Sequence, residues 1–344
     1  MSDRTIASHM IVEKKQRVWT GPQIVLTLII VLISLTCLLP FINVAATSMS
    51  TKSAILSGQI SFLPKINKSA EEIDAEVQRV IERAEQTGDE ELKANAASQV
   101  NPVKLGFDFT AYKAIFADPA MTRSLVFTVI ITVVYTAFSM VLTILMAYPL
   151  TKKRLRGRKF FNFLALFTMY FSGGTIPIYL NIKELGLLDS PWSLILPGML
   201  STYNMIILKS FFTALPGELE EAATIDGAND FQILLQVYLP LSMASLATLT
   251  LFYAVGKWNS FQDALYYIQN KAYQPLQLKL YHLIKGSQAV DIAAMEGGSQ
   301  TVETAISESI QPASIIFATL PILVVYPFVQ RYFVAGVTIG AVKG

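Results

Sequence analysis

The sequence has few charged residues, one cysteine and two histidines, and each shortage excludes a class of function. Asp, Glu, Lys and Arg make up 15% of the 344 residues, against about 25% in a typical soluble domain. The lone Cys37 excludes an internal disulfide and any site of several thiolates, and His9 and His282 leave little for zinc or a histidine relay. The net charge of +2 is small and dispersed. We therefore expect no metal site and no nucleic-acid partner.

Catalytic motifs are missing as well. The sequence contains no G-x-x-x-x-G-K-[ST] phosphate loop, no H-E-x-x-H, no G-x-S-x-G and no G-x-G-x-x-G. We therefore expect no enzymatic activity and no nucleotide hydrolysis on this chain. Asp, Glu, His and Arg, which form the ion sites of ion-coupled transporters, are absent from its long apolar runs. If the chain moves a solute, the energy comes from another protein.

Apolar residues make up 53% of the chain and form six long runs without Asp, Glu, Lys or Arg. A helix needs about 20 such residues to cross hydrocarbon about 30 Å thick. The pattern predicts an all-α membrane protein with six transmembrane helices. The last four runs are shorter or are broken by Pro and Gly. A cleaved signal peptide is the alternative for the first run, but its apolar core would span only about 7 to 15 residues. The runs are residues 24–47, 124–151, 160–180, 192–208, 241–256 and 313–330.

Lys and Arg between the runs predict the orientation, because cytoplasmic loops of membrane proteins are enriched in them. Four basic residues precede the first run within residues 1–20, and six lie in residues 152–159 after the second run. The connection between the third and fourth runs has a single basic residue, Lys183, which suits the outside. Six helices then place both termini in the cytoplasm, with residues 1–20 as a cytoplasmic N-terminal segment.

Residues 48–123 form a long external loop in this topology, and the loop contains an amphipathic segment. Ser69 and Glu72 match the S-x-x-E capping box of a helix start. Apolar residues follow at helical spacing, and Thr87-Gly88 ends the pattern. The apolar residues are Ile73, Val77, Val80, Ile81 and Ala84. We expect an external helix within about residues 66–105, either as a solvated addition or as a docking surface for an external partner.

Residues 213–238, between the fourth and fifth runs, are predicted to form two short cytoplasmic helices. Pro216 suits a first helical turn, Gly227 suits a left-handed stop, and Asn229 or Asp230 can cap the second helix. Five acidic residues lie here despite the basic bias of the other cytoplasmic loops. They are Glu218, Glu220, Glu221, Asp226 and Asp230. Membrane orientation does not explain these charges, whereas a protein partner does; an ordinary solvated hairpin is the plainer alternative.

The same segment resembles the E-A-A-x3-G-x9-I-x-L-P signature of permease subunits of bacterial ABC importers, with Val in place of Ile. The matching residues are Glu221, Ala222, Ala223, Gly227, Val237, Leu239 and Pro240. Residues 326–333 and 336–344 resemble the C-terminal ending of carbohydrate-uptake permeases of the maltose-transporter type, especially those for oligosaccharides. The resemblance covers nearly the whole chain from Ile24 onward.

The resemblance implies a type I ABC importer permease fold over residues 21–344, located in the bacterial cytoplasmic membrane. Such a subunit pairs with a sister permease and receives a sugar from an external solute-binding protein. Residues 213–238 would then be the coupling hairpin that binds a dimer of a cytoplasmic ABC ATPase. ATP and Mg²⁺ would be held by that ATPase, with no cofactor on this chain. Residues 61–65 and 106–113 look like two halves of one short family segment, so the residues between them look inserted.

Candidates for the sugar pathway are aromatic and amide side chains near membrane depth, because sugars stack on rings and pair their hydroxyls with amides. These candidates are Tyr135, Tyr203, Asn204, Trp258 and Asn259. Aromatic belts at the membrane interface and hydrogen bonds between helices are the alternative roles. For the chain as a whole, two alternatives remain: an ABC permease for a solute other than sugar, and a membrane channel or structural anchor without an ATPase.

Overall fold

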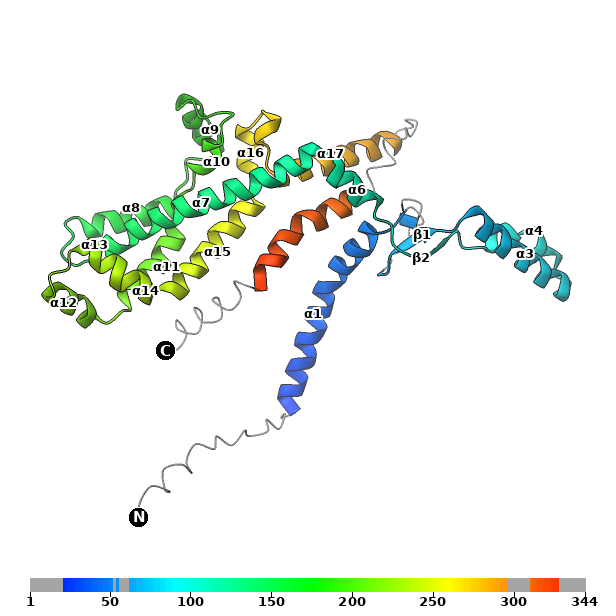
Figure 1. Cartoon of the computed structure of the whole chain (residues 1–344), viewed down its shortest axis with the longest axis horizontal. Helices are drawn as coiled ribbons and strands as arrows, with labels where there is room; N and C mark the ends of the chain where they lie inside the picture. Colours follow the sequence, from blue (N-terminus) through cyan, green and yellow to red (C-terminus); the bar gives the residue numbers. More distant parts are fainter. Residues whose placement is uncertain (1–20, 52–53, 56–61, 296–309, 328–344) are drawn as a thin grey trace, which may run out of the picture.

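The computed structural model describes residues 21–51, 54–55, 62–295 and 310–327, and this part of the chain is mainly helical (Figure 1). Three of its helices are long and apolar enough to cross a membrane: α1 (Gly21–Ser48), α7 (Pro119–Thr151) and the helix Ile310–Pro327. They coincide with the first, second and sixth apolar runs. The basic residues before position 21 and the C-terminal ending beyond position 327 lie outside the described residues.

Further helices and two strands make up the rest of the described chain. The helices among them are α3 (Ala70–Thr87), α4 (Glu90–Ala94), α5 (Ala96–Gln99), α6 (Thr110–Ala117), α8 (Arg158–Tyr170), α9 (Thr175–Glu184), α10 (Trp192–Ile195), α11 (Thr202–Thr213), α12 (Gly217–Ile225), α13 (Asp230–Ile233), the π-helix η1 (Leu234–Tyr238), α14 (Leu239–Leu241), α15 (Met243–Asn259), α16 (Gln262–Tyr267), the 3₁₀ helix η2 (Lys271–Tyr273) and α17 (Leu276–Met295). The strands are β1 (Lys65–Asn67) and β2 (Val103–Leu105).

The third, fourth and fifth apolar runs are not straight helices. The third is the pair α8 and α9, which bend by 113° relative to each other, and the fifth belongs to a pair bent by 84° where α14 meets α15. If each bent pair is one span, the described residues contain up to five spans. The fourth run, residues 192–208, is also broken, because Pro197 and a left-handed Gly198 (φ +79°) separate α10 from α11. With 12 residues, α11 is only about 18 Å long.

The main bundle is organised around α7, which packs against α11 and α15. One end of this bundle is closed by a core cluster of Ala147, Leu208, Phe212, Leu249 and Tyr253. In contrast, α1 stands apart from the bundle in Figure 1, and Ala46 and Ser48 are its buried residues. The outer surface of α1 is therefore apolar and uncovered within this chain, as expected of a helix that meets lipid or another subunit.

Residues 65–105 fold as a separate unit, here called the inserted module, which projects from the end of the bundle that α6 forms (Figure 1). Its base is the antiparallel pair β1 and β2, in which Asn67 faces Val103. Ser69 caps α3 with Glu72 in a reciprocal capping box, and Gly88 ends the helix at φ +70°, as the sequence predicts. Helix α3 packs against α4 and α5, which leaves Ala84 of its apolar stripe buried and the other stripe residues half-buried.

Candidate coupling site

At the opposite end of α7 from the module lies the acidic hairpin, defined here as Gly217–Leu241 (Figure 1). Its first helix, α12, ends at a turn in which Gly227 has φ +85° and donates its backbone N–H to Thr224. Asn229 then caps α13 in a reciprocal capping box with Gln232, each side chain accepting from the other residue's backbone N–H at 2.9 Å. Of the two caps that the sequence allows, the structure uses Asn229.

The hairpin returns to the membrane helices through an irregular segment. The π-helix η1 follows α13, α14 contains Pro240, and the chain bends by 84° before α15. π-Helical turns are uncommon and often mark functional positions. Leu239 and Pro240 therefore lie where the hairpin joins α15.

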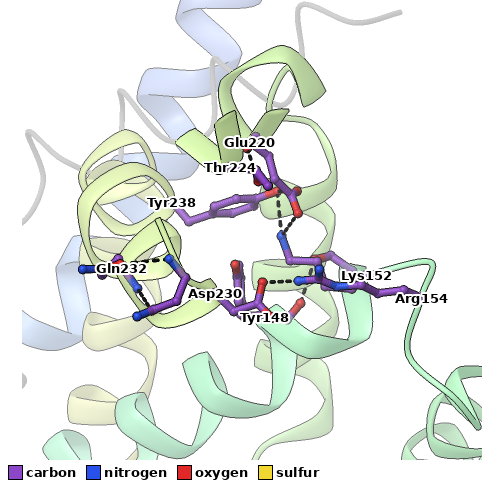
Figure 2. A network of polar contacts seen from close by, with 10 residues as sticks. Tyr148, Lys152, Arg154, Glu220, Thr224, Asp230, Gln232 and Tyr238 are labelled. Carbon is purple, nitrogen blue, oxygen red and sulfur yellow. Dashed lines mark hydrogen bonds and ion pairs between the residues drawn. The ribbon is translucent and has the colours of Figure 1, made fainter. Parts of the chain in front are cut away.

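A buried lysine anchors the hairpin to the end of α7 (Figure 2). The Nζ atom of Lys152 lies 2.7 Å from Oε1 of Glu220 in α12, and Lys152 is 9% exposed. Lys152 also donates to the hydroxyl of Tyr238 at 3.3 Å, and Tyr238 donates to Glu220 Oε2 at 2.7 Å. The ammonium group faces the ring of Tyr148 at 4.2 Å and that of Tyr238 at 4.4 Å. The ammonium group of Lys152 thus contacts side chains of α7, α12 and η1.

The positive charges of this network stabilise the ionised form of Glu220. Burial alone would raise the pKa of Glu220, but hydrogen bonds from Lys152 and Tyr238 and the positive charges of Lys152 and Arg154 outweigh it, so the pKa lies below its usual value. A second ion pair joins Arg154, two residues beyond Lys152, to Asp230 in α13 (Figure 2). Both helices of the hairpin are therefore tied to the same short stretch after α7.

Apolar packing reinforces this attachment on the inner side of the hairpin. Ala223, Ala228, Val237 and Leu239 pack against the core cluster that closes the bundle. The two alanines of the E-A-A pattern differ in burial: Ala223 is half-buried against the core, whereas Ala222 is exposed. In a helix, successive side chains are about 100° apart, so the two cannot share a contact of that kind.

The outer side of the hairpin is acidic and includes an exposed apolar residue. Glu218, Glu221 and Asp226 are exposed, and Ile225 is 85% exposed. Ile225 is thus an exposed apolar side chain surrounded by exposed carboxylates. Within the described residues, no three His, Cys, Asp or Glu side chains gather to hold a metal ion. The hairpin therefore has an exposed acidic outer face and an inner face that is tied to the bundle.

The candidates for the sugar pathway lie in different surroundings. Tyr135 donates its hydroxyl to the carbonyl of Gly198 at 2.8 Å, Trp258 is buried and donates to Ala318, and Asn259 donates to Val255. Asn204 is buried at the start of α11, and its neighbour Tyr203 is 57% exposed. Trp258 and Asn259 line two different grooves, of about 630 Å³ and about 320 Å³.

Sequence reasoning missed several residues that the fold brings together. Lys152 was interpreted only as a marker of orientation, and Tyr238 was not singled out. Tyr253 was also missed: its hydroxyl lies 2.7 Å from Thr143 and accepts from the backbone N–H of Ser201, while its ring contacts Tyr135. Lys257 in α15 is buried beside Tyr135 and 3.6 Å from Asp263. Its place directly after the apolar run was the available signal.

Comparison with known proteins places these features in a family. The family model of the binding-protein-dependent transport system inner membrane component matches residues 114–339. That range contains the acidic hairpin, α7 and α15, and it begins after the inserted module.

Individual relatives extend the match beyond that range. The chain is 38% identical over 317 residues to the polygalacturonan/rhamnogalacturonan transport system permease protein YtcP of Bacillus subtilis, covering 92% of this chain and 96% of the relative. It is 46% identical over 238 residues to protein LplC of the same organism, covering 69% and 80%. A crystal structure of a bacterial ABC transporter involved in the import of the acidic polysaccharide alginate aligns with a TM-score of 0.69 and 30% identity over 90% of this chain and 95% of that one. The chain therefore belongs to the family of inner-membrane components of binding-protein-dependent transport systems, which are permease subunits of ABC transporters and not enzymes.

Proposed function

We propose that the chain is one permease subunit of an ATP-driven importer that carries an oligosaccharide across the cytoplasmic membrane after an external binding protein delivers it. Family membership supports the import mechanism, and the names of similar proteins, which mention polygalacturonan, rhamnogalacturonan and alginate, support a carbohydrate substrate. They favour sugar over other solutes. A channel or anchor without an ATPase does not fit a family defined by binding-protein-dependent transport.

The observation that carries the coupling mechanism is the acidic hairpin fixed to α7 through Lys152 and Glu220. Its exposed outer face would seat in a groove of the partner ATPase, and its fixed inner face would pass the movement of that ATPase to α7 and α15. The coupling residues would be Glu221, Ala222, Ala223, Gly227, Val237, Leu239 and Pro240. ATP and Mg²⁺ would bind to the ATPase dimer.

The proposed topology has six spans with both termini in the cytoplasm. It is supported by the position of the acidic hairpin and the inserted module at opposite ends of α7 (Figure 1), and by the basic residues at 152–159. The fourth span would be the broken pair α10 and α11. Labelling of a cysteine introduced at Glu72 from the outside only, and at Gly344 from the inside only, tests this topology.

A sister permease is the proposed partner within the membrane. The apolar surface of α1 is uncovered within this chain, and a translocation pathway between two permeases would use side chains from both. On this chain, Tyr203 is the candidate with the most exposed ring. The other candidates would lie beneath the surface of the path or at its outer edge; they are Tyr135, Asn204, Trp258 and Asn259.

Uptake of a labelled oligogalacturonide into membrane vesicles, together with pull-down of the ATPase, tests the function. We expect Glu221→Lys to reduce both, because it reverses a charge on the exposed face, and the loss should be larger at low salt. Glu82→Lys in the inserted module is a matched control, since it makes the same charge change on an exposed helix that lies elsewhere. Equal uptake for the wild type and Glu221→Lys would contradict the coupling role.

A further inference from the structure

A groove of about 430 Å³ lies between the end of α7 and the start of α13, next to the network of Figure 2. Much of its wall is apolar and is formed by Leu145, Tyr148, Leu155, Phe231 and Leu234. Basic side chains complete it, namely Lys152, Arg154 and Arg156, against the single carboxylate of Asp230. The groove therefore combines a hydrocarbon surface with an excess of positive charge.

One of these positive charges lacks a partner. Lys152 pairs with Glu220, and Arg154 pairs with Asp230. Arg156 is exposed and makes no hydrogen bond or ion pair with the described residues. The guanidinium group presents several donors in a planar fork that matches phosphate. An anion near Arg156 would complete the charge balance of the groove.

An exposed apolar stripe leads along α7 to the same groove. Phe138, Val141 and Leu145 are 46%, 54% and 50% exposed, and their spacing of three and four residues places them on one face of the helix. Leu145 is also part of the groove wall. A ligand that satisfies both features needs an anionic group and a long hydrocarbon chain, which a free phosphate or an acidic peptide does not provide.

The position of the groove relative to the bilayer fits such a ligand. Helix α7 has 33 residues and is about 50 Å long, whereas the hydrocarbon core is about 30 Å thick. Its uncharged run ends at Thr151 and a basic stretch begins at Lys152, so this end is placed at the level of the lipid headgroups. In the proposed topology this is the cytoplasmic leaflet, where clusters of Lys and Arg attract anionic lipids.

We propose that this groove binds an anionic phospholipid of the cytoplasmic leaflet, with the phosphate at Arg156 and an acyl chain along Leu145, Val141 and Phe138. The inference rests on the orientation given under the proposed function. A lipid held here would contact the segment that contains Lys152 and Arg154, and so would support the anchor of the acidic hairpin from the membrane side.

Native mass spectrometry of the full chain in detergent tests the site, with phosphatidylglycerol and phosphatidylcholine of identical acyl chains as probes. We expect phosphatidylglycerol to bind more tightly to the wild type. Arg156→Gln should weaken phosphatidylglycerol binding roughly fivefold through the loss of one interfacial charge. Lys153→Gln is the matched control, because Lys153 is an exposed cation of the same loop that does not line the groove.

Four results would overturn the proposal. The first three are equal affinity for the two lipids, equal phosphatidylglycerol binding by the wild type and Arg156→Gln, and displacement of the lipid by soluble glycerol phosphate. A fourth is loss of lipid binding when the partner ATPase is added, which would assign the groove to the ATPase contact. Leu145→Gln should weaken both lipids and separates the acyl-chain contact from the charge. The lipid assay involves no transport, so its failure leaves the importer proposal standing, whereas normal uptake by Glu221→Lys would remove the coupling role alone.

Discussion

The inserted module and the acidic hairpin are built from the same local devices but are attached to the protein in different ways. Each has a helix with a reciprocal capping box and a left-handed glycine, at Gly88 and Gly227. In the module, Glu72 pairs with Lys104 while the two side chains are 45% and 39% exposed. In the hairpin, Glu220 pairs with Lys152, which is 9% exposed.

The difference in burial determines what each ion pair contributes: local order in the module, and attachment to α7 in the hairpin. An exposed ion pair contributes little because water and salt screen it, and in the module it joins two parts of the same small unit. A buried pair is costly to break because one charge is left without a partner in a poorly hydrated site. The hairpin is thus held at a fixed position on α7. Among the described residues, no comparable buried ion pair joins the module to the bundle.

The largest effect is expected from Gly227→Val, which changes the turn of the hairpin. No atom lies within 4 Å of an added Cβ, so the cost comes from φ +85° alone: about 1–2 kcal/mol for a residue with a Cβ, and more for a β-branched one. ATPase pull-down and uptake should fall together at matched permease levels. Gly227→Asn is the control, because Asn tolerates the left-handed region, and it should retain both activities.

The second effect is expected from Lys152→Met, which keeps the length of the side chain but removes the cation. Because Glu220 is 29% exposed, the cost should be smaller than for a fully buried pair, about 2 kcal/mol. Amide exchange in α12 should then accelerate roughly 30-fold. Lys153→Met should have little effect, and Lys152→Arg should restore part of the protection. Unchanged exchange in Lys152→Met would contradict the anchoring role.

A smaller effect is expected from Glu72→Gln in the inserted module. The glutamine keeps the hydrogen bond of the capping box but loses the ion pair with Lys104. Since both partners are exposed, amide exchange in α3 should change by less than about threefold at physiological salt. A change as large as that of Lys152→Met would show that exposure does not account for the difference between the two regions.

The smallest effect on ATPase binding is expected from removal of the module. Asn67 and Val103 face each other across β1 and β2, so residues 68–102 can be replaced by an Asn-Gly turn without moving the ends of the strands. ATPase pull-down should be unchanged. Loss of ATPase binding by a well-inserted variant would contradict the separation of the two regions, whereas loss of sugar uptake alone would identify the module as a docking surface for the external binding protein.

Several features follow from the sequence because they depend on neighbouring residues. Apolar runs identified α1, α7 and the helix Ile310–Pro327, since hydrophobicity over about 20 residues is sufficient for a spanning helix. Ser69 with Glu72, Gly88 and Gly227 identified caps and stops, because a capping hydrogen bond spans only three residues and a left-handed turn depends on its own backbone. The E-A-A pattern indicated the family for the same reason.

Other features were decided only by the tertiary structure. Lys152 and Tyr238 are 86 residues apart in the sequence. Nothing in either segment alone indicates that both side chains contact the carboxylate of Glu220. The breaks at Gly198 and Ser242 likewise depend on what each half-helix packs against, since a Pro or Gly permits a bend without fixing its angle. Long-range contacts of this kind arise from packing geometry and burial, which the order of residues along the chain does not contain, and they determine whether a hairpin is a solvated loop or a rigid extension of the membrane helices.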